Sequence, residues 1–233
     1  MLVSIAIPVY EMNSMGKHFL DISLRNISNQ TYKNIQVVIS DHSANSDIEN
    51  LCNLYSKKLN ILYVKNIENR GSSSANLNNA IRNCDGEIIK ILMQDEFLYD
   101  TASLEKLVNI FTNDNCINWT VSGCIYGPNE FDLKGSMYPA YSKDIIRGIN
   151  TIGSPSMLTI KNENLEFFDE NLLWVMDCEY YKRMYDKFGE PQIINEHHIF
   201  VAQHINQVTS MLSEEVKNKE VDYLIKKYNY EFK

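Results

Sequence analysis

The sequence has few basic residues and no long apolar run, and each shortage excludes a class of protein. It holds 22 Lys and Arg against 30 Asp and Glu, a formal net charge of -8, whereas broad binding to nucleic-acid phosphates needs clustered basic side chains. We therefore expect no nucleic-acid partner. The first apolar run, residues 2–10, is too short to span a bilayer and lacks the basic start and cleavage site of a signal peptide. These features predict a cytoplasmic protein, at most peripheral to the inner face of a membrane.

Several motifs with a known chemistry are also missing. The five cysteines include no CxxC pair, so neither a zinc site nor a redox motif is expected and the thiols should be reduced. The first apolar run is not followed by G-x-G-x-x-G or by G-x-x-x-x-G-K-[ST]. Dinucleotide-dependent dehydrogenases and P-loop NTPases are therefore disfavoured.

What is present indicates one folded α/β domain. The chain has 233 residues, of which 44% are hydrophobic and 11% aromatic, enough for a sizeable core. Through the first hundred residues, short Ile- and Val-rich runs alternate with helix-like stretches, which is typical of a parallel sheet covered by helices on both faces. The predicted strands are 2–10, 35–40, 60–64 and 87–93, and the predicted helices are 17–30, 46–58 and 74–83. In such sheets ligands bind at the carboxyl ends of the strands.

The second half of the chain is less regular. A long stretch with few helix or strand signals, residues 127–153, predicts a functional or mobile loop. Around it we expect helices at 103–111, about 174–188 and 213–228, and strands at 118–126, 156–160 and 192–201.

Carboxylates follow two of the predicted strands. Asp41 comes after the second and Asp95 and Glu96 after the fourth, so their side chains should converge at one edge of the sheet. Carboxylate oxygens suit Mg²⁺ or Mn²⁺, and these cations keep coordination sites open for phosphate oxygens. A nucleoside diphosphate with a divalent cation is one interpretation, and Asp capping of the following helices is the other.

Five segments, in this order and spacing, resemble the family two glycosyltransferases. The resemblance implies the GT-A fold, a Rossmann-like α/β fold with a mostly parallel central sheet flanked by helices and an acceptor-side extension. It also implies a nucleotide-sugar donor linked to UDP, dTDP or GDP, and a saccharide or glycolipid acceptor. Within a single domain, 1–233, it suggests a nucleotide-binding half (1–100), an acceptor-binding half (101–212) and a C-terminal helix (213–233). The segments are SIAIPVYEM, VVISDHSANSD, NRGSSSAN, ILMQDEFLYD and FFDENLLWVMDCEYYKRM.

The resemblance assigns the donor-binding residues. Asp41 resembles the carboxylate that binds the base or the ribose, and the segment 69–76 matches a pattern that leads into a helix and lies near phosphate. An alternative for Arg70 is a solvated surface residue. The donor-binding residues so implied are Pro8, Val9 and Tyr10 in the wall of the nucleobase pocket, with Asp41, Arg70, Gly71, Asn76, Gln94 and Asp95.

The metal motif departs from its relatives. The family typically has Asp-x-Asp, whereas Met93 stands here in place of the first Asp and has no hard oxygen ligand. The resemblance implies that Asp95 binds Mn²⁺ or Mg²⁺ with the donor diphosphate, helped by Glu96 directly or through water. His204 lies where relatives carry a basic residue or a His, and imidazole is a plausible third ligand. A partly buried structural His is the alternative.

Asp177 aligns with the catalytic base of the family. Such a carboxylate removes the proton of the acceptor hydroxyl as its oxygen attacks the anomeric carbon, which implies inversion. The alternative is a surface residue paired with Lys182 or Arg183. For the whole chain, two other functions stay open: a sugar-phosphate nucleotidyltransferase, and an inactive nucleotide-binding module, which the substitution at Met93 favours.

Overall fold

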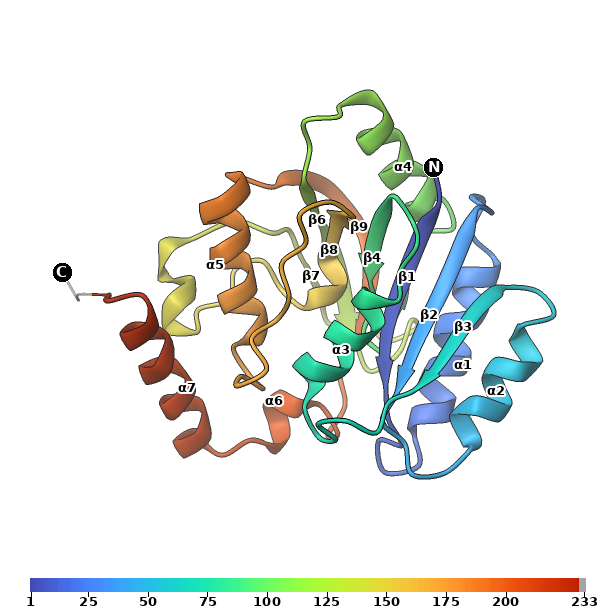
Figure 1. Cartoon of the computed structure of the whole chain (residues 1–233), viewed down its shortest axis with the longest axis horizontal. Helices are drawn as coiled ribbons and strands as arrows, with labels where there is room; N and C mark the ends of the chain where they lie inside the picture. The colour runs from blue at the N-terminus through green and yellow to red at the C-terminus, as the bar shows by residue number, and fades with distance from the viewer. Residues whose placement is uncertain (231–233) are drawn as a thin grey trace.

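The computed structural model describes residues 1–230, and its amino-terminal half is a parallel sheet. The strands β1 (Val3–Val9), β2 (Ile35–Asp41), β3 (Asn60–Lys65) and β4 (Ile88–Ile91) run in the order β3-β2-β1-β4 (Figure 1). Every residue of β1, β2 and β4 is buried, because helices cover both faces of the sheet. The helices α1 (Gly16–Ser28) and α2 (Asp47–Tyr55) pack on one face and α3 (Ser73–Arg82) on the other. The elements predicted for this half are confirmed to within a few residues.

The same sheet continues into the second half with mixed directions. Strand β8 (Leu158–Lys161) is antiparallel to β4, β6 (Trp119–Gly127) is antiparallel to β8, and β9 (Gln192–Ala202) is parallel to β6. Helix α4 (Ser103–Asn113) packs on the face covered by α1, and α5 (Met176–Phe188) on the face covered by α3. A short 3-10 helix, η2 (Pro155–Met157), precedes β8.

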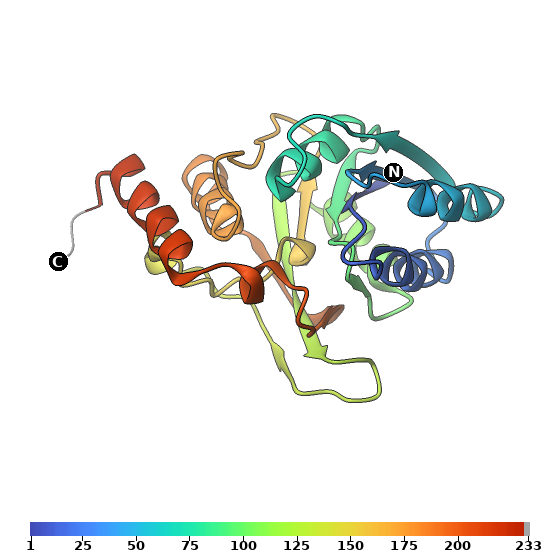
Figure 2. The same ribbon diagram turned by 90° about the horizontal axis from the view of Figure 1, so that it is seen from below.

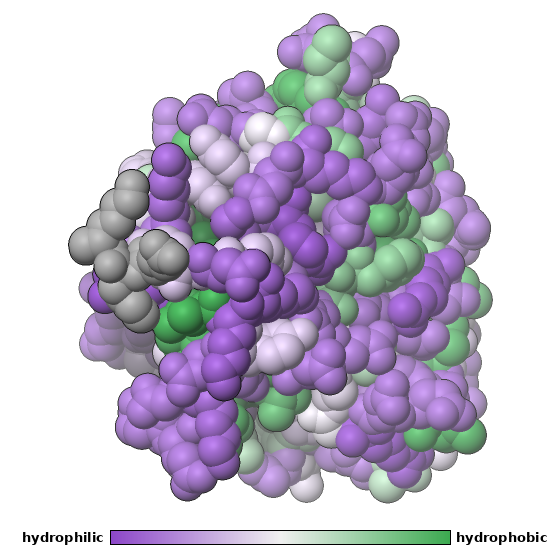
Figure 3. All heavy atoms as spheres, turned by 60° about the vertical axis from the view of Figure 1, so that its left-hand side comes forward, coloured by the Kyte–Doolittle hydropathy of each residue, from purple (hydrophilic) through white to green (hydrophobic). Residues whose placement is uncertain are grey.

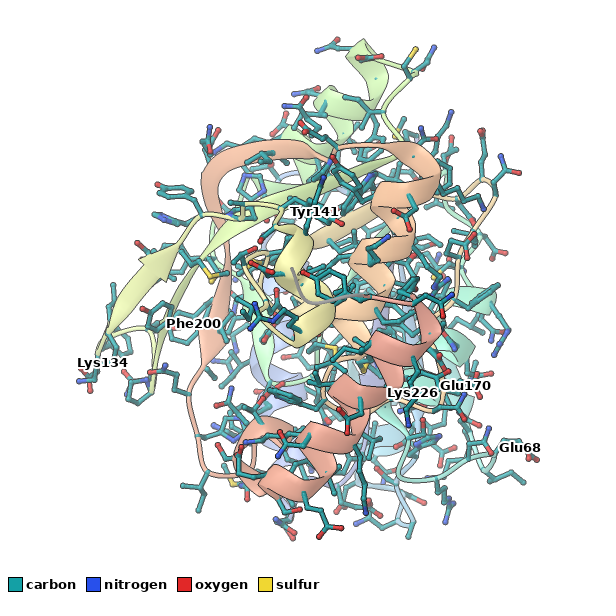
Figure 4. The ribbon with its side chains drawn as sticks, turned by 90° about the vertical axis from the view of Figure 1, so that its left-hand side faces the viewer. Glu68, Lys134, Tyr141, Glu170, Phe200 and Lys226 are labelled. Carbon is teal, nitrogen blue, oxygen red and sulfur yellow. The ribbon has the colours of Figure 1, made fainter. Side chains whose placement is uncertain are left out.

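Two short strands were not predicted. Strand β5 (Glu96–Leu98) lies directly after Asp95 and pairs antiparallel with β9, so a buried strand follows Asp95 directly. The stretch 127–153 contains β7 (Gly135–Met137), which pairs with β6, and a 3-10 helix, η1 (Lys143–Arg147). The β6–β7 hairpin projects from the body of the molecule (Figure 2), and Lys134 lies at its projecting end (Figure 4). Three-residue strands are too short to show a period in the sequence.

The carboxyl-terminal segment returns across the second half of the molecule. A single turn, α6 (Val208–Met211), leads to α7 (Glu214–Lys227), which confirms the predicted helix, although residues 231–233 of that prediction lie outside the described residues. Leu224 of α7 is fully buried in the cluster that α5 also enters. The surface on this side is mostly hydrophilic (Figure 3). Among residues 1–230, no helix combines the length and the apolarity that crossing a bilayer needs.

Candidate active site

A cavity of about 580 Å³ opens at the carboxyl ends of the parallel strands. Its wall is built from the ends of β1, β2 and β4, the start of α3 and the segment 206–212. This is the place that the sheet topology predicts for a ligand. Seven of the predicted donor-binding residues line the cavity: Pro8, Tyr10, Arg70, Gly71, Asn76, Gln94 and Asp95.

Two amide side chains in this wall hold the end of β1 and the loop that follows it in place. Gln94 accepts a hydrogen bond from the Tyr10 N–H at 3.0 Å and donates to the carbonyl oxygens of Tyr10 and Gly16 at 3.0 and 2.8 Å. Asn76 donates to the carbonyl of Val9 at 3.0 Å and accepts from the Ser40 hydroxyl at 2.7 Å. Both amides are therefore occupied by the protein, and they shape the cavity.

Val9 and Asp41 do not line the cavity. Val9 is fully buried in the core, because successive residues of a strand face opposite sides and Pro8 and Tyr10 take the cavity side. Asp41 is also fully buried. Its carboxylate accepts hydrogen bonds from the Tyr63 hydroxyl at 2.7 Å, the Lys65 Nζ at 3.1 Å and the Ser43 N–H at 2.7 Å. Val9 and Asp41, both predicted to contact the donor, thus lie outside the lining of the cavity.

Asp95 and His204 meet on the cavity side of β4. The Asp95 Oδ2 lies 2.8 Å from the His204 Nε2, and the imidazole stacks on Phe19 with the ring centres 4.6 Å apart. The His204 Nδ1 accepts from the Asn206 N–H at 3.2 Å, so in the neutral ring the proton is on Nε2 and points at Asp95. Asp95 also borders a second cavity of about 430 Å³ between α1 and the β6–β7 hairpin.

Glu96 is enclosed by the protein. It is 5% exposed and accepts a hydrogen bond from the Ser154 hydroxyl at 2.7 Å. Burial, with the negative charge of Asp95 as a second cause, raises the pKa of Glu96 to about 8. Across residues 1–230, no group of three His, Cys, Asp or Glu side chains is placed to hold a metal ion. The predicted trio of Asp95, Glu96 and His204 is therefore not assembled, because β5 turns Glu96 inward.

Asp177 lies in the first turn of α5 and is not among the residues that line the cavity. Its Oδ2 accepts from the Asn150 side-chain amide at 2.7 Å and its Oδ1 from the Cys178 N–H at 2.7 Å, and burial raises its pKa from 3.8 to about 6. The preceding Met176 contacts the hydroxyl of Ser73, a residue of the cavity wall, at 3.3 Å. The alternative role is not observed, since Lys182 pairs with Asp186 and Arg183 pairs with Glu166 and Glu179.

Two residues that support Asp177 were not found from the sequence. Asn150 also donates to the Gly153 carbonyl at 2.9 Å and accepts from the N–H groups of Ile152 and Gly153 at 3.0 and 2.8 Å. Glu220 of α7 accepts hydrogen bonds from three successive backbone N–H groups, those of residues 173–175, at 2.9, 2.9 and 3.1 Å. Glu220 thus caps the start of α5. Its 45-residue separation from Val175 leaves no local pattern by which the sequence could reveal it.

The loop between β1 and α1 contacts the segment after β9, which forms part of the cavity wall. Met12, Asn13 and Ser14 have φ angles of 47°, 51° and 72°, in the left-handed region that L-residues rarely adopt. The Asn13 side-chain amide donates to the Asn206 side-chain oxygen at 3.1 Å. The loop therefore bends sharply and closes the cavity rim against the segment after β9.

The arrangement of sheet, cavity and carboxylates is that of a GT-A glycosyltransferase fold. The family model Glycosyl transferase family 2 matches residues 4–178. The chain belongs to this family, and the resemblance seen in its motifs is confirmed.

Relatives with similar sequences are mostly longer proteins. An uncharacterized glycosyltransferase of Rickettsia prowazekii is 27% identical over 234 residues, which cover 91% of the chain and 69% of that protein. One from Rickettsia felis is 34% identical over 155 residues, which cover 65% of the chain and 23% of that protein. The chondroitin synthase of Escherichia coli is 27% identical over 192 residues, 78% of the chain and 26% of that protein. The chain thus spans about a quarter of two of these relatives.

Solved structures share the fold at low sequence identity. Staphylococcus aureus TarS 1-349 in complex with UDP-GlcNAc matches all of the chain with a TM-score of 0.71 and 15% identity, over 68% of its own length. The mannosyltransferase PcManGT of Pyrobaculum calidifontis, in complex with GDP-Man and Mn²⁺, matches 99% of the chain and 65% of its own, with a TM-score of 0.68 and 16% identity. These likenesses confirm the predicted fold class.

Proposed function

We propose that the chain transfers a sugar from a nucleoside diphosphate sugar to a hydroxyl of a saccharide or glycolipid acceptor, with inversion. The observation that carries this proposal is Asp177, a carboxylate with a raised pKa that directly follows Met176, which contacts Ser73 of the cavity wall. Family membership supports the reaction class. Neighbouring structures with UDP, UDP-GlcNAc and GDP-Man support a UDP- or GDP-linked donor, and a dTDP-linked donor remains part of the proposal. Residues 1–100 would bind the donor and residues 101–212 the acceptor.

Asp177 is the base of the proposed reaction. With a pKa of about 6 it is mostly ionised at pH 7, yet more basic than an ordinary carboxylate, which suits proton abstraction at that pH. Asn150 fixes Oδ2 and the Cys178 N–H fixes Oδ1. As the acceptor oxygen bonds to the anomeric carbon, its proton passes to Asp177, and the bond from that carbon to the diphosphate breaks on the opposite side.

Asp95 and Arg70 line the cavity at the proposed position of the diphosphate, and His204 contacts Asp95. A carboxylate oxygen and an imidazole nitrogen, 2.8 Å apart, are donors that fit Mn²⁺, and Mg²⁺ at the oxygen, with phosphate and water as the other ligands. A bound cation would neutralise charge on the departing diphosphate. To free Nε2 for the cation, His204 must carry its proton on Nδ1 and give up the contact with the Asn206 N–H. The Arg70 guanidinium lines the same cavity and adds a permanent positive charge.

The experiment that tests this proposal is hydrolysis of nucleotide sugars by the purified chain. We expect slow release of nucleoside diphosphate from one of UDP-GlcNAc, UDP-glucose, dTDP-glucose or GDP-mannose with Mn²⁺, and loss of this release in Asp177→Asn. Binding of the donor without any release, even with saccharide acceptors added, would instead support the inactive nucleotide-binding module. Absence of both binding and release would overturn the proposal.

A further inference from the structure

Tyr181 of α5 places a buried hydroxyl against the loop of residues 150–154. The segment that contains η1 and leads into this loop packs against α5 (Figure 4). The Tyr181 side chain is fully buried, and its ring stacks on Trp119 of β6 with the ring centres 6.4 Å apart. Its hydroxyl donates to the carbonyl oxygens of Gly153 and Ser154, which lie 3.2 and 3.0 Å away. Because the core holds the ring, the hydroxyl is a fixed point to which the loop is bound.

The Tyr181 hydroxyl keeps its proton and remains a donor. Burial, and then the negative charge of Asp177, raise its pKa well above the ordinary value. A buried hydroxyl without an acceptor costs free energy, so Tyr181 favours the conformation of the loop that brings the two carbonyls to it. Gly153 has a φ of 108°, in a region that glycine adopts readily, and this allows the turn.

The Gly153 carbonyl connects Tyr181 to Asn150. This oxygen also accepts a hydrogen bond from the Asn150 side-chain amide at 2.9 Å, and the same amide donates to the Asp177 Oδ2 at 2.7 Å. A side-chain amide has two N–H donors in one plane, so one serves Gly153 and the other serves Asp177. The direction of the donor that reaches Asp177 therefore depends on where the Gly153 carbonyl is held.

The spacing of Asp177 and Tyr181 on the helix closes these contacts into a ring. The two residues are four positions apart on α5, so their side chains lie on the same face. The neighbouring Tyr180 is equally buried, but it stacks on Phe168 and donates to the Glu166 carbonyl at 3.3 Å. Only the Tyr181 hydroxyl thus belongs to the ring.

The other titratable groups near the ring leave its charge unchanged. Cys178, next to Asp177 on α5, keeps its proton because burial raises its pKa. Glu96 of β5 acts on Tyr181 through its charge, although less than Asp177 does, and Glu220 of α7 binds the backbone just before Asp177. Removing the Tyr181 hydroxyl therefore removes a hydrogen-bond donor and no charge.

We propose that Tyr181 is a positioning residue for Asp177, acting through the loop that carries Asn150. This inference rests on the proposed function. A donor aimed at a carboxylate favours its charged form and fixes the oxygen that takes the proton of the acceptor hydroxyl. Without the Tyr181 hydroxyl, the loop relaxes and the Asn150 donor is no longer held in place. Asp177 then keeps its proton to a higher pH and is less well oriented.

The test compares Tyr181→Phe with Tyr180→Phe, because each change removes one buried hydroxyl from α5 and keeps the ring. The quantities are kcat, the donor KM and the acid midpoint, the pH at which kcat has fallen to half on the acid side. With the nucleotide sugar that the wild type hydrolyses in Mn²⁺, Tyr181→Phe should lower kcat about three- to tenfold at unchanged donor KM. It should also raise the acid midpoint by at least about 0.2 pH unit. Tyr180→Phe should change neither kcat nor the acid midpoint.

A second comparison shows whether the effect passes through Asn150. Asn150→Ala removes the donor itself and should raise the acid midpoint by about 0.5–1 pH unit. Adding Tyr181→Phe to Asn150→Ala should then change neither kcat nor the midpoint further, since residues that act through one another are not additive. An NMR titration of the Asp177 carboxyl carbon in the whole chain measures the same protonation without any substrate.

Three outcomes would overturn the assignment: an unmoved acid midpoint in Tyr181→Phe, equal shifts in both Tyr variants, or a further shift in the double variant. If Tyr181→Phe fails to fold, Gly153→Ala decides, because a methyl group at this φ is strained and clashes with Met157, which displaces the shared carbonyl. If the wild type hydrolyses no nucleotide sugar, the proposed function fails. The NMR titration still shows whether Tyr181 controls the protonation of Asp177, so the two failures are distinguishable.

Discussion

Three carboxyl groups near the cavity differ in what surrounds them. Asp41 accepts bonds from a hydroxyl, an ammonium group and a backbone N–H, whereas Glu96 is enclosed with one hydroxyl and a pKa of about 8. Asp177 is also enclosed, and burial raises its pKa to about 6 while two donors limit the rise. A carboxyl group near 6 is ionised at neutral pH and can still accept a proton.

Replacing Asp177 tests the base directly. We expect Asp177→Asn to lower kcat by a factor of about 10² to 10⁴ with little change in nucleotide affinity, because Asn keeps the size and can still accept from Asn150. Steady-state assays and calorimetry measure the two quantities. Asp186→Asn, on the same helix and paired with Lys182, is the matched control and should keep its activity. Full activity in Asp177→Asn would exclude this residue as the base.

The pH dependence should report the same group. Since the base must be ionised, kcat is expected to fall below pH 6, tenfold per pH unit, in a kcat–pH profile. In the folded protein Asp177 keeps its proton up to about pH 6, whereas an ordinary Asp side chain has a pKa of 3.8. The stability that this proton contributes is therefore complete below pH 4 and lost as the pH rises through 6. Asp177→Asn should thus melt at a higher temperature than the wild type above pH 6, and the difference should shrink towards pH 4.

The proposed metal binding at Asp95 can be tested separately from any contribution of Glu96. Asp95→Asn should lose most of the gain in nucleotide affinity that Mn²⁺ gives, at least tenfold, because it removes the carboxylate charge at the cavity wall. The pKa of about 8 means that Glu96 is protonated at pH 7. Gln has nearly the same shape as the protonated acid, so Glu96→Gln should keep the Mn²⁺ response. Calorimetry with Mn²⁺ and with EDTA distinguishes these cases. A lost response in Glu96→Gln would restore Glu96 as a ligand.

At the scale of elements, the start of α5 depends on α7. The helix has no side-chain cap of its own at Val175, and Glu220 supplies the acceptors from another part of the chain. The same turn carries Asp177, whose second support, Asn150, lies in the loop after η1. Three separate segments thus position the proposed base.

Removing the cap should destabilise the protein and displace the base. Glu220→Ala leaves three backbone N–H groups without their carboxylate, and we expect a loss of about 2 kcal/mol in the free energy of unfolding, a fall of about 4–8 °C in Tm. Thermal unfolding measures this, and kcat should fall with it. Glu215→Ala, whose side chain is 76% exposed on the same helix, should change the stability by less than about 0.5 kcal/mol. Equal effects of the two variants would contradict a capping role.

At the scale of the whole molecule, the cavity lies on the parallel half of a sheet that continues unbroken into the mixed half. A ligand that binds only the folded chain stabilises all of it. A nucleoside diphosphate at a hundred times its Kd should therefore raise the free energy of unfolding by about 3 kcal/mol and Tm by about 5–10 °C. A thermal-shift screen with and without Mn²⁺ measures this. Adenosine without phosphates is the control and should give a much smaller shift.

The sequence predicted the parallel half closely, because strands buried on both faces are continuous apolar runs with clear ends. It also predicted, through the family resemblance, that Asp95 and His204 are neighbours. It did not predict the direction of Glu96, which depends on the short strand β5, nor the burial of Asp41, which depends on the partners Tyr63 and Lys65. Asn150 and Glu220 depend on contacts over 27 and 45 residues, for which local patterns carry no signal.

The hydrogen bond between Asn13 and Asn206 affects when the chain can fold during its synthesis. These residues are 193 positions apart, and Asp95 and His204 are 109 apart. Contacts of such separation form after local ones, since their loop-closure entropy is greatest. A chain emerging from the ribosome can pair β1, β2, β3 and β4 early, but it cannot complete the cavity rim until residue 206 has left the exit tunnel. The binding site is therefore the last part of the sheet edge to mature during synthesis.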